Sequence, residues 1–240
     1  MDDTQRTTPL APIRVARRAV ILYTLMMRST IENNSTHPRA NDWLAILPEW
    51  LDGLEMKGEI EPWDAEILAT PLGQLDRERQ TDARWSGEAS GVLGWALQRV
   101  AAPTDFEPVD PNKVFDAFGF DPARMVQSAG EFIAGAALRP AAELLAYYAH
   151  VAIVQCCMRS RSASPGLTPF LQKVLRQNMG YLGVEIGEAD FSAAQESVAR
   201  LSDEQHKPLL GNYVVRLHAA EWLAGGRERY WGEASGDADE

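Results

Sequence analysis

The carboxylate of Glu88 lies on a helix face that is otherwise apolar. On a helical wheel drawn from Arg84 onward, Glu88 falls between the angular positions of Trp85 and Trp95, within a stripe that belongs in a core. A carboxylate on a buried face is costly unless it is paired or hydrogen-bonded. We therefore weigh two roles for Glu88. The first, which we favour, is an ion pair that fixes the register of packed helices; the second is a general acid or base in a pocket.

Arginines supply the partners that an ion pair needs. Arg84 lies four residues before Glu88 and is its nearest local partner on a helix. Arg17, Arg18 or Arg216 could reach the same carboxylate from another helix. The sequence alone leaves the choice among these arginines open.

A catalytic site, by contrast, would be a hydrolase-like pocket between helices. Its candidate residues are Glu88, Arg84, Arg216 and His218. No recognised motif supports this alternative, because the chain has no His-Glu-x-x-His pair, no Cys/His zinc spacing, no nucleophile elbow and no Gly-rich nucleotide loop. We therefore expect no metal and no cofactor, and we favour a protein that is not an enzyme.

The charge balance restricts the partners. The chain has 240 residues, of which 23 are basic and 34 acidic, giving a net charge of −11. This balance opposes binding to nucleic acid or to an anionic membrane and favours a basic protein partner. We find neither a signal-peptide pattern nor an apolar run as long as a membrane span. The only cysteines, Cys156 and Cys157, are adjacent and diverge on a helix, so we expect a reducing, cytoplasmic setting.

Helical periodicity predicts the elements that position these residues. Apolar residues recur at helical spacing over Ile13–Arg28, and Pro12 suits the first turn of that helix. Asp82 is the expected cap of the helix that carries Trp85 and runs to about Ala101. Within it, Gly91 and Gly94 predict the close approach of another helix, since each glycine costs roughly 1 kcal/mol relative to alanine.

The second half of the chain repeats this pattern. Further helices are expected from Asp121-Pro122 through Leu138, after Pro140, and over 170–179, 191–201 and 209–224, with a basic loop at 159–169. Only 181–186 and 212–215 are weak strand candidates. We predict an all-α fold: a single compact multi-helix domain of about eight to ten helices, with at most a minor strand pair. Its expected parts are a flexible N-terminus (1–11), the helical domain (12–225) with a candidate sub-boundary near 102–111, and an acidic flexible tail (226–240).

Seven tryptophans are many for this length. Most of them fall on apolar helix faces, where a core role is the default. Trp63 and Trp231 lie beside charged or Gly-rich sequence instead, and they are the candidates for a surface contact.

The segment around Trp85 also carries a resemblance. Residues 84–89 read Arg-Trp-Ser-Gly-Glu-Ala, and residues 92–97 read Val-Leu-Gly-Trp-Ala-Leu. This pair of motifs resembles the central signature of the bacterial domain of unknown function 4272 family. Two weaker matches follow in order: Leu138–Pro140 with the helix Tyr147–Cys157, and Val215–Leu223, where Ala220 and Glu221 depart from the family pattern.

The resemblance covers roughly residues 12–225 and implies a compact helical domain. The residues that would form its structural signature are Trp85, Glu88, Trp95, Arg216 and Trp222. It implies no established activity, so no residue gains a catalytic role from it.

Three functions remain as hypotheses. The leading one is a protein-interaction module, such as an immunity or accessory protein in a bacterial toxin or secretion setting, because the chain is acidic and lacks catalytic motifs. The second is the hydrolase-like enzyme around Glu88. The third is a homodimeric structural protein in which exposed apolar helix faces meet.

Overall fold

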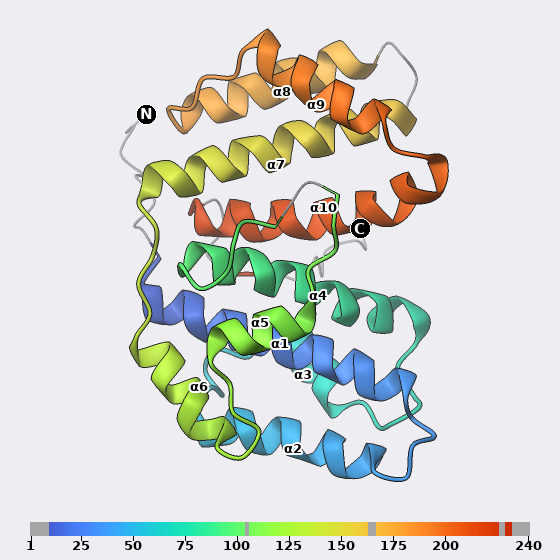
Figure 1. The fold of residues 1–240 in the computed structure, drawn as a ribbon, viewed down its shortest axis with the longest axis vertical. Coiled ribbons are helices and arrows are strands. Elements are labelled where there is room, and N and C mark those ends of the chain that lie inside the picture. Colours follow the sequence, from blue (N-terminus) through green and yellow to red (C-terminus); the bar gives the residue numbers. More distant parts are fainter. Residues whose placement is uncertain (1–9, 104–105, 163–166, 226–228, 232–240) are drawn as a thin grey trace, which may run out of the picture. The chain divides into compact units, whose positions relative to one another are not determined.

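The computed structural model describes residues 10–103, 106–162, 167–225 and 229–231 (Figure 1). The helices in these ranges are α1 (Pro12–Asn33), α2 (Ala40–Gly53), α3 (Pro62–Ala69), α4 (Arg77–Ala96), α5 (Pro111–Phe118), α6 (Met125–Ala134), α7 (Ala141–Ser162), α8 (Leu167–Tyr181), α9 (Glu188–Ala199) and α10 (Asp203–Leu223). The described residues form no strand, and the weak strand candidate 212–215 lies inside α10. The predicted all-α class is confirmed, and the number of described helices falls within the predicted range.

Contacts along the chain gather in two compact units, which we describe separately. Of the described residues, the α1–α6 unit comprises those from 10 to 138 and 229–231, and the α7–α10 unit comprises those from 139 to 225. The Pro-rich connection near 102–111 lies inside the first of these, between α4 and α5. The chain thus leaves the α1–α6 unit after Leu138, and the described residues 229–231 belong to that unit again.

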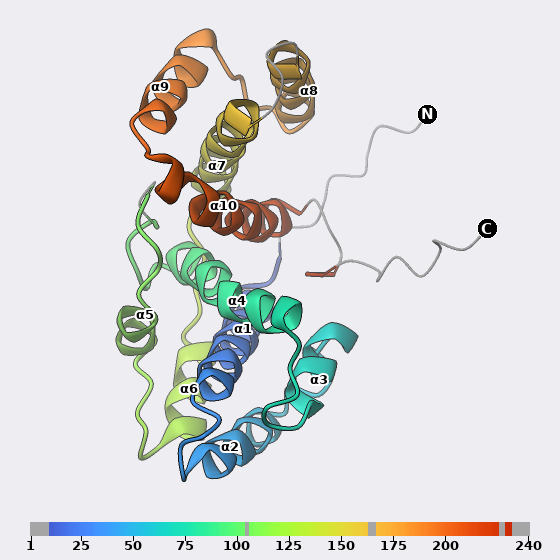
Figure 2. The ribbon, with the colours of Figure 1, turned by 90° about the vertical axis from the view of Figure 1, so that its right-hand side faces the viewer.

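Helix α1 is the centre of the α1–α6 unit. It begins at Pro12, as expected, and packs against α2, α3, α4 and α6 (Figures 1 and 2). Most of its side chains are buried, including an unbroken run from Arg18 to Met26. A helix that is buried almost all round can line a cavity on one side and hold ion pairs on another.

Helix α4 packs along α1 at close range. Gly87 permits this contact, because a Cβ there would lie 3.0 Å from Met26 Cγ of α1. Gly94 faces α5 instead, where a Cβ would lie 2.7 Å from Phe118 Cε1. At Gly91 the neighbour is Val109, at 2.7 Å, in the α4–α5 connection. The predicted close approach of another helix is therefore confirmed at Gly94, whereas the neighbour of Gly91 is a loop.

The limits of α4 differ from the prediction. Asp76, not Asp82, caps the helix, and its carboxylate accepts the Arg79 N–H at 2.8 Å. The first residues of α4 are polar because they lie at the surface, so they carry no apolar periodicity to announce a helix. The helix ends at Ala96, before the expected end near Ala101.

Other helix boundaries also differ from the prediction. Asp121 closes a turn by accepting the Ala123 N–H at 2.9 Å, and α6 begins only at Met125. The loop predicted over 159–169 is shorter, because α7 continues to Ser162 and α8 begins at Leu167. Arg161 explains the longer α7, since its guanidinium donates to the carbonyls of Val198 and Leu201 at 2.9 and 2.8 Å.

Helix α7 is the core of its own unit. It packs against α8, α9 and α10 (Figure 2). Helix α10 starts at a capping box formed by Ser202 and Gln205. Residues 141–161 are long and apolar enough to cross a membrane by length and composition, but 56% of that window is buried inside the structure. This property carries little weight, because the core helix of a globular unit passes the same test.

Candidate functional site

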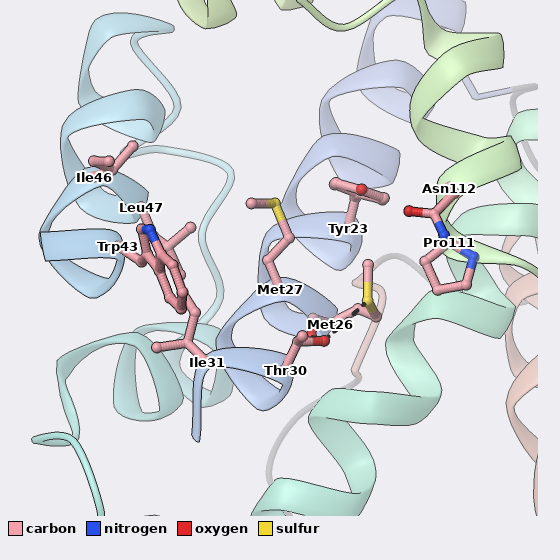
Figure 3. A pocket seen from close by; sticks show the side chains of 10 residues that line it. All are labelled: Tyr23, Met26, Met27, Thr30, Ile31, Trp43, Ile46, Leu47, Pro111 and Asn112. Atoms are coloured by element: carbon pink, nitrogen blue, oxygen red, sulfur yellow. Dashed lines mark hydrogen bonds between the residues drawn. The ribbon is translucent and has the colours of Figure 1, made fainter. Parts of the chain in front are cut away.

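An apolar pocket of about 410 Å³ opens between α1, α2 and α5. Figure 3 shows side chains from the three helices facing one space. The lining residues are Tyr23, Met26, Met27, Thr30 and Ile31 from α1, Trp43, Ile46 and Leu47 from α2, and Pro111 and Asn112 from α5. The volume falls within the range of small-ligand and side-chain pockets.

Each helix brings its lining residues by its own spacing. On α2, Trp43, Ile46 and Leu47 stand three and four residues apart and therefore share one face. Helix α5 presents Pro111 at its first turn, and its cap Asp110 accepts the Asn112 N–H at 2.9 Å. The pocket thus lies where one face of α2 and the start of α5 meet α1.

The lining is adaptable rather than rigid. Met26 and Met27 have flexible, polarisable side chains, which fit irregular apolar partners. Trp43 stacks on His37 with ring centroids 4.4 Å apart, and Ile46 is 46% exposed at the mouth. An exposed isoleucine beside a half-buried tryptophan is the kind of rim on which an apolar group can dock.

Few polar groups face this space. The Thr30 hydroxyl is turned back, because it donates to the Met26 carbonyl at 3.1 Å. The Tyr23 hydroxyl makes no hydrogen bond to the residues that the structure describes. Burial, with a smaller contribution from the negative charge of Asp116, raises the pKa of Tyr23 from 10.0 to about 12. Tyr23 is therefore a neutral hydrogen-bond donor, and with the exposed Asn112 amide it is the main polar feature of the pocket.

The arrangement suits binding rather than bond breaking. The residues lining the pocket include no carboxylate, histidine, lysine, arginine or cysteine. Among the described residues, no group of three His, Cys, Asp or Glu side chains is placed to hold a metal ion. An apolar cavity with a neutral donor orients a ligand but does not transfer a proton at neutral pH.

Glu88 is buried, as the wheel predicts, and it lies outside this pocket. Its side chain is 6% exposed, and Oε1 accepts the Val109 N–H at 2.9 Å. A second cavity, of about 360 Å³, adjoins Val109 and Gly91, but Glu88 does not line it. Glu88 thus fastens the α4–α5 connection to α4.

Three of the four arginines predicted as partners of Glu88 belong to the α1–α6 unit. Arg84 is exposed. Arg17 pairs with Glu59 at 3.3 Å, and Arg18 pairs with Asp64 at 2.6 Å.

The remaining candidates belong to the α7–α10 unit. Arg216 is 1% exposed, with its guanidinium 5.3 Å from the Tyr213 ring centroid, and His218 is half-buried. Trp222 of the expected signature is buried on the same helix, α10.

Four tryptophans named in the sequence analysis lie in the α1–α6 unit. Trp95 is buried in the α1–α6 unit and Trp85 is half-buried there. Trp63 and Trp231, the candidates for a surface contact, are both half-buried and lie against each other with ring centroids 4.3 Å apart.

Sequence reasoning missed the pocket itself. Tyr23 and Met27 appear in the sequence only as members of an apolar helical stripe. The available signal was an excess of apolar residues on α2, where Trp43, Leu44, Ile46 and Leu47 crowd more than one narrow face. Nothing in the sequence indicates that α5 stands across from them.

The fold and the pocket define an all-α protein with an apolar cavity between three helices of its first unit. A family model described as "Domain of unknown function (DUF4272)" matches residues 2–170, and the chain belongs to this family. The match confirms the predicted resemblance and includes every residue that lines the pocket, whereas the motif at 215–223 lies beyond it. Comparison with curated proteins and with solved structures gives no significant match.

Proposed function

We propose that the protein is a protein-interaction module whose pocket receives a large apolar side chain from a basic partner. The observation that carries the proposal is the pocket between α1, α2 and α5, which is apolar, lined by two methionines and open at Ile46. At protein interfaces, a few large side chains that are buried in pockets of the partner account for most of the affinity.

Charge supports a basic partner. Exposed carboxylates flank the lining residues in sequence: Asp42 and Glu49 on α2, and Asp116 on α5. The whole chain carries a net charge of −11. An excess of negative charge speeds encounter with a basic surface, and this contribution weakens as salt rises.

An immunity or accessory protein in a bacterial toxin or secretion setting is the concrete form that we propose for this module. Such a protein binds its partner without doing chemistry, which agrees with the neutral lining of the pocket. The hydrolase-like alternative gains no support, since Glu88 is buried, is bound to a backbone N–H and is not part of the pocket. The homodimer remains an outcome of the test below.

The test is a selection of random linear peptides, displayed on phage, against the immobilised full-length chain. We expect peptides in which one aromatic or large aliphatic residue is flanked by lysine or arginine. Their binding should weaken at least tenfold when Ile46→Asp places a charge in the mouth of the pocket. Rising salt should weaken it further.

The matched control is Val214→Asp on α10, because Val214 is 48% exposed and Ile46 is 46% exposed. This control should leave binding unchanged. Selected peptides that bind Ile46→Asp as well as they bind the wild type would overturn the proposal. Light scattering measures whether the wild type is a dimer that Ile46→Asp dissociates and Val214→Asp does not. Such a dimer through Ile46 would also overturn the proposal.

A further inference from the structure

The carboxylate of Glu61 holds two successive backbone N–H groups from the far end of the chain. Oε1 accepts the Tyr230 N–H at 2.7 Å, and Oε2 accepts the Trp231 N–H at 2.9 Å. Successive N–H groups converge on one anion only where the backbone bends, and residues 229–231 form such a bend. Glu61 therefore recognises a bent peptide backbone, whatever its side chains.

Asp64, one turn further on, recognises a side chain. Its Oδ1 accepts the indole N–H of Trp231 at 2.7 Å. The same carboxylate is held from the other side by Arg18, whose two terminal nitrogens donate at 2.6 and 2.8 Å. Asp64 is fully buried, so these charge-assisted bonds are shielded from water.

Aromatic faces complete the contact. The Arg18 guanidinium lies 4.5 Å from the Tyr230 ring centroid and 5.5 Å from that of Trp231. Trp63 packs against Trp231, and Tyr230 is only 1% exposed. Cation–π contacts of this kind strengthen when they are desolvated.

These contacts have the composition of a peptide-recognition site. Four residues of α1 and the start of α3 (Arg18, Glu61, Trp63 and Asp64, the latch site) bind two residues that lie 167 to 170 positions away from Glu61 and Asp64. Backbone bonds give affinity, and a stacked indole with its own acceptor gives specificity. All six residues belong to the α1–α6 unit, and none lines the pocket described above.

We propose that the latch site is a binding site for a bent Tyr-Trp segment, and that Tyr230–Trp231 is its resident ligand, an intramolecular latch that a peptide of the same chemistry displaces. The chain leaves the α1–α6 unit after Leu138, and Tyr230 and Trp231 attach its described residues 229–231 to that unit again. A tethered ligand has an effective concentration in the millimolar range, which a free peptide must exceed. The wild-type site is therefore closed to dilute peptide.

The probe is a fluorescein-labelled peptide with the sequence of residues 229–234, Arg-Tyr-Trp-Gly-Glu-Ala, measured by fluorescence anisotropy against full-length chains. The double variant Y230A/W231A weakens the resident ligand and should bind the peptide at least tenfold more tightly than the wild type. Adding Glu61→Ala to that variant should abolish the gain. Adding Glu49→Ala, an exposed carboxylate on α2, should leave it intact.

A folded Y230A/W231A chain that binds the peptide no better than the wild type would overturn the proposal, as would binding that survives Glu61→Ala. If the double variant does not fold, amide hydrogen exchange of the wild type decides. The amides of Tyr230 and Trp231 should be protected, and a millimolar excess of unlabelled peptide should speed their exchange. Exchange at the rate of an unstructured peptide, or no response to added peptide, would overturn the latch.

Discussion

Helix α1 contributes to two buried ion pairs that are covered in different ways. Arg28 pairs with Glu32 on the same helix at 2.7 Å, whereas Arg18 pairs with Asp64 of α3 at 2.6 Å. All four side chains are 7% exposed or less. The two pairs have the same chemistry and similar burial, so the difference lies in what surrounds them.

Backbone groups surround the Arg28–Glu32 pair. The Arg28 guanidinium also donates to the carbonyls of Thr70 and Pro71 at 3.0 and 3.3 Å. The Glu32 carboxylate accepts the N–H groups of Gly73 and Leu75, each at 3.0 Å. The connection from α3 to α4 is thereby fixed on both sides, and the pair can be reached only if that connection unfolds.

Side chains from a short, sequence-distant segment cover the Arg18–Asp64 pair instead. Tyr230 and Trp231 lie over it, and three hydrogen bonds hold them to Glu61 and Asp64. Release of two residues would uncover the pair while the helices stay folded. Equal burial can therefore belong to a fixed structural joint or, as proposed for the latch site, to a site whose cover is a ligand.

Arg28→Ala should have the largest effect. It leaves the buried Glu32 charge without a cation and two backbone carbonyls without a donor, so we expect a loss of about 3–5 kcal/mol in the free energy of unfolding. Urea denaturation measures it, with exposed Arg84→Ala as the control, which should change stability by less than about 0.5 kcal/mol. A loss no greater than that of the control would contradict the idea of a fixed joint.

Asp64→Ala should cost less, about 2–3 kcal/mol, because release of the latch lets water reach the uncompensated Arg18. The effects of Trp231→Ala and Asp64→Ala on stability should also be coupled. Trp231→Ala and Asp64→Ala should together cost less than the sum of the single losses, since both remove the same hydrogen bond. Additive losses, measured by urea denaturation of the four chains in the cycle, would show that the latch and the ion pair are independent.

Some features of the fold could be predicted from the sequence and others could not, for a physical reason. Apolar periodicity predicted α1 and the burial of Glu88, because both are local properties of a helix wheel. The hydrogen bond from the Val109 N–H to Glu88 was not predictable, since every residue except proline carries such a backbone donor. The first turns of helices α4 and α10 were not predicted, because these turns are polar and show no apolar periodicity.

The pocket and the latch depend on tertiary contacts that leave little trace in a single sequence. The contact between Trp63 and Trp231 joins two residues that the sequence marked only by their polar neighbours. The bond from Tyr230 to Glu61 spans 169 positions, and no local pattern encodes such a pairing. The family resemblance, by contrast, was visible in the residues around Trp85, because a packed helix keeps its signature in one contiguous segment.

Acid should weaken the fixed joint by a smaller amount. Burial alone would raise the pKa of Glu32, but hydrogen bonds from Arg28 and from the N–H groups of Gly73 and Leu75 together outweigh it and hold the pKa below its ordinary value of 4.5. A carboxyl with a lowered pKa in the folded state stabilises the protein above pH 4.5, and this contribution is lost as the pH falls toward the lowered value. Urea denaturation at a series of acidic pH values should show a shallower decline for Glu32→Gln than for the wild type; parallel curves would contradict the assignment.

The smallest effect should come from the Tyr23 hydroxyl on the pocket side of α1. It has no hydrogen-bond partner among the described residues, so Tyr23→Phe should change the free energy of unfolding at neutral pH by less than about 0.5 kcal/mol. The difference should appear at high pH. The unfolded tyrosine loses its proton near 10.0, whereas the folded one keeps it until about 12, so stability falls as the pH rises between these values.

Tyr23→Phe should lack that part of the decline, which urea denaturation of both chains at pH 9 to 11 measures. If the variant were instead destabilised at neutral pH by as much as Asp64→Ala, the hydroxyl would be a structural group like the ion pairs. A near-neutral change would leave it available to a ligand, which is the property that separates the pocket face of α1 from the face that holds its charges.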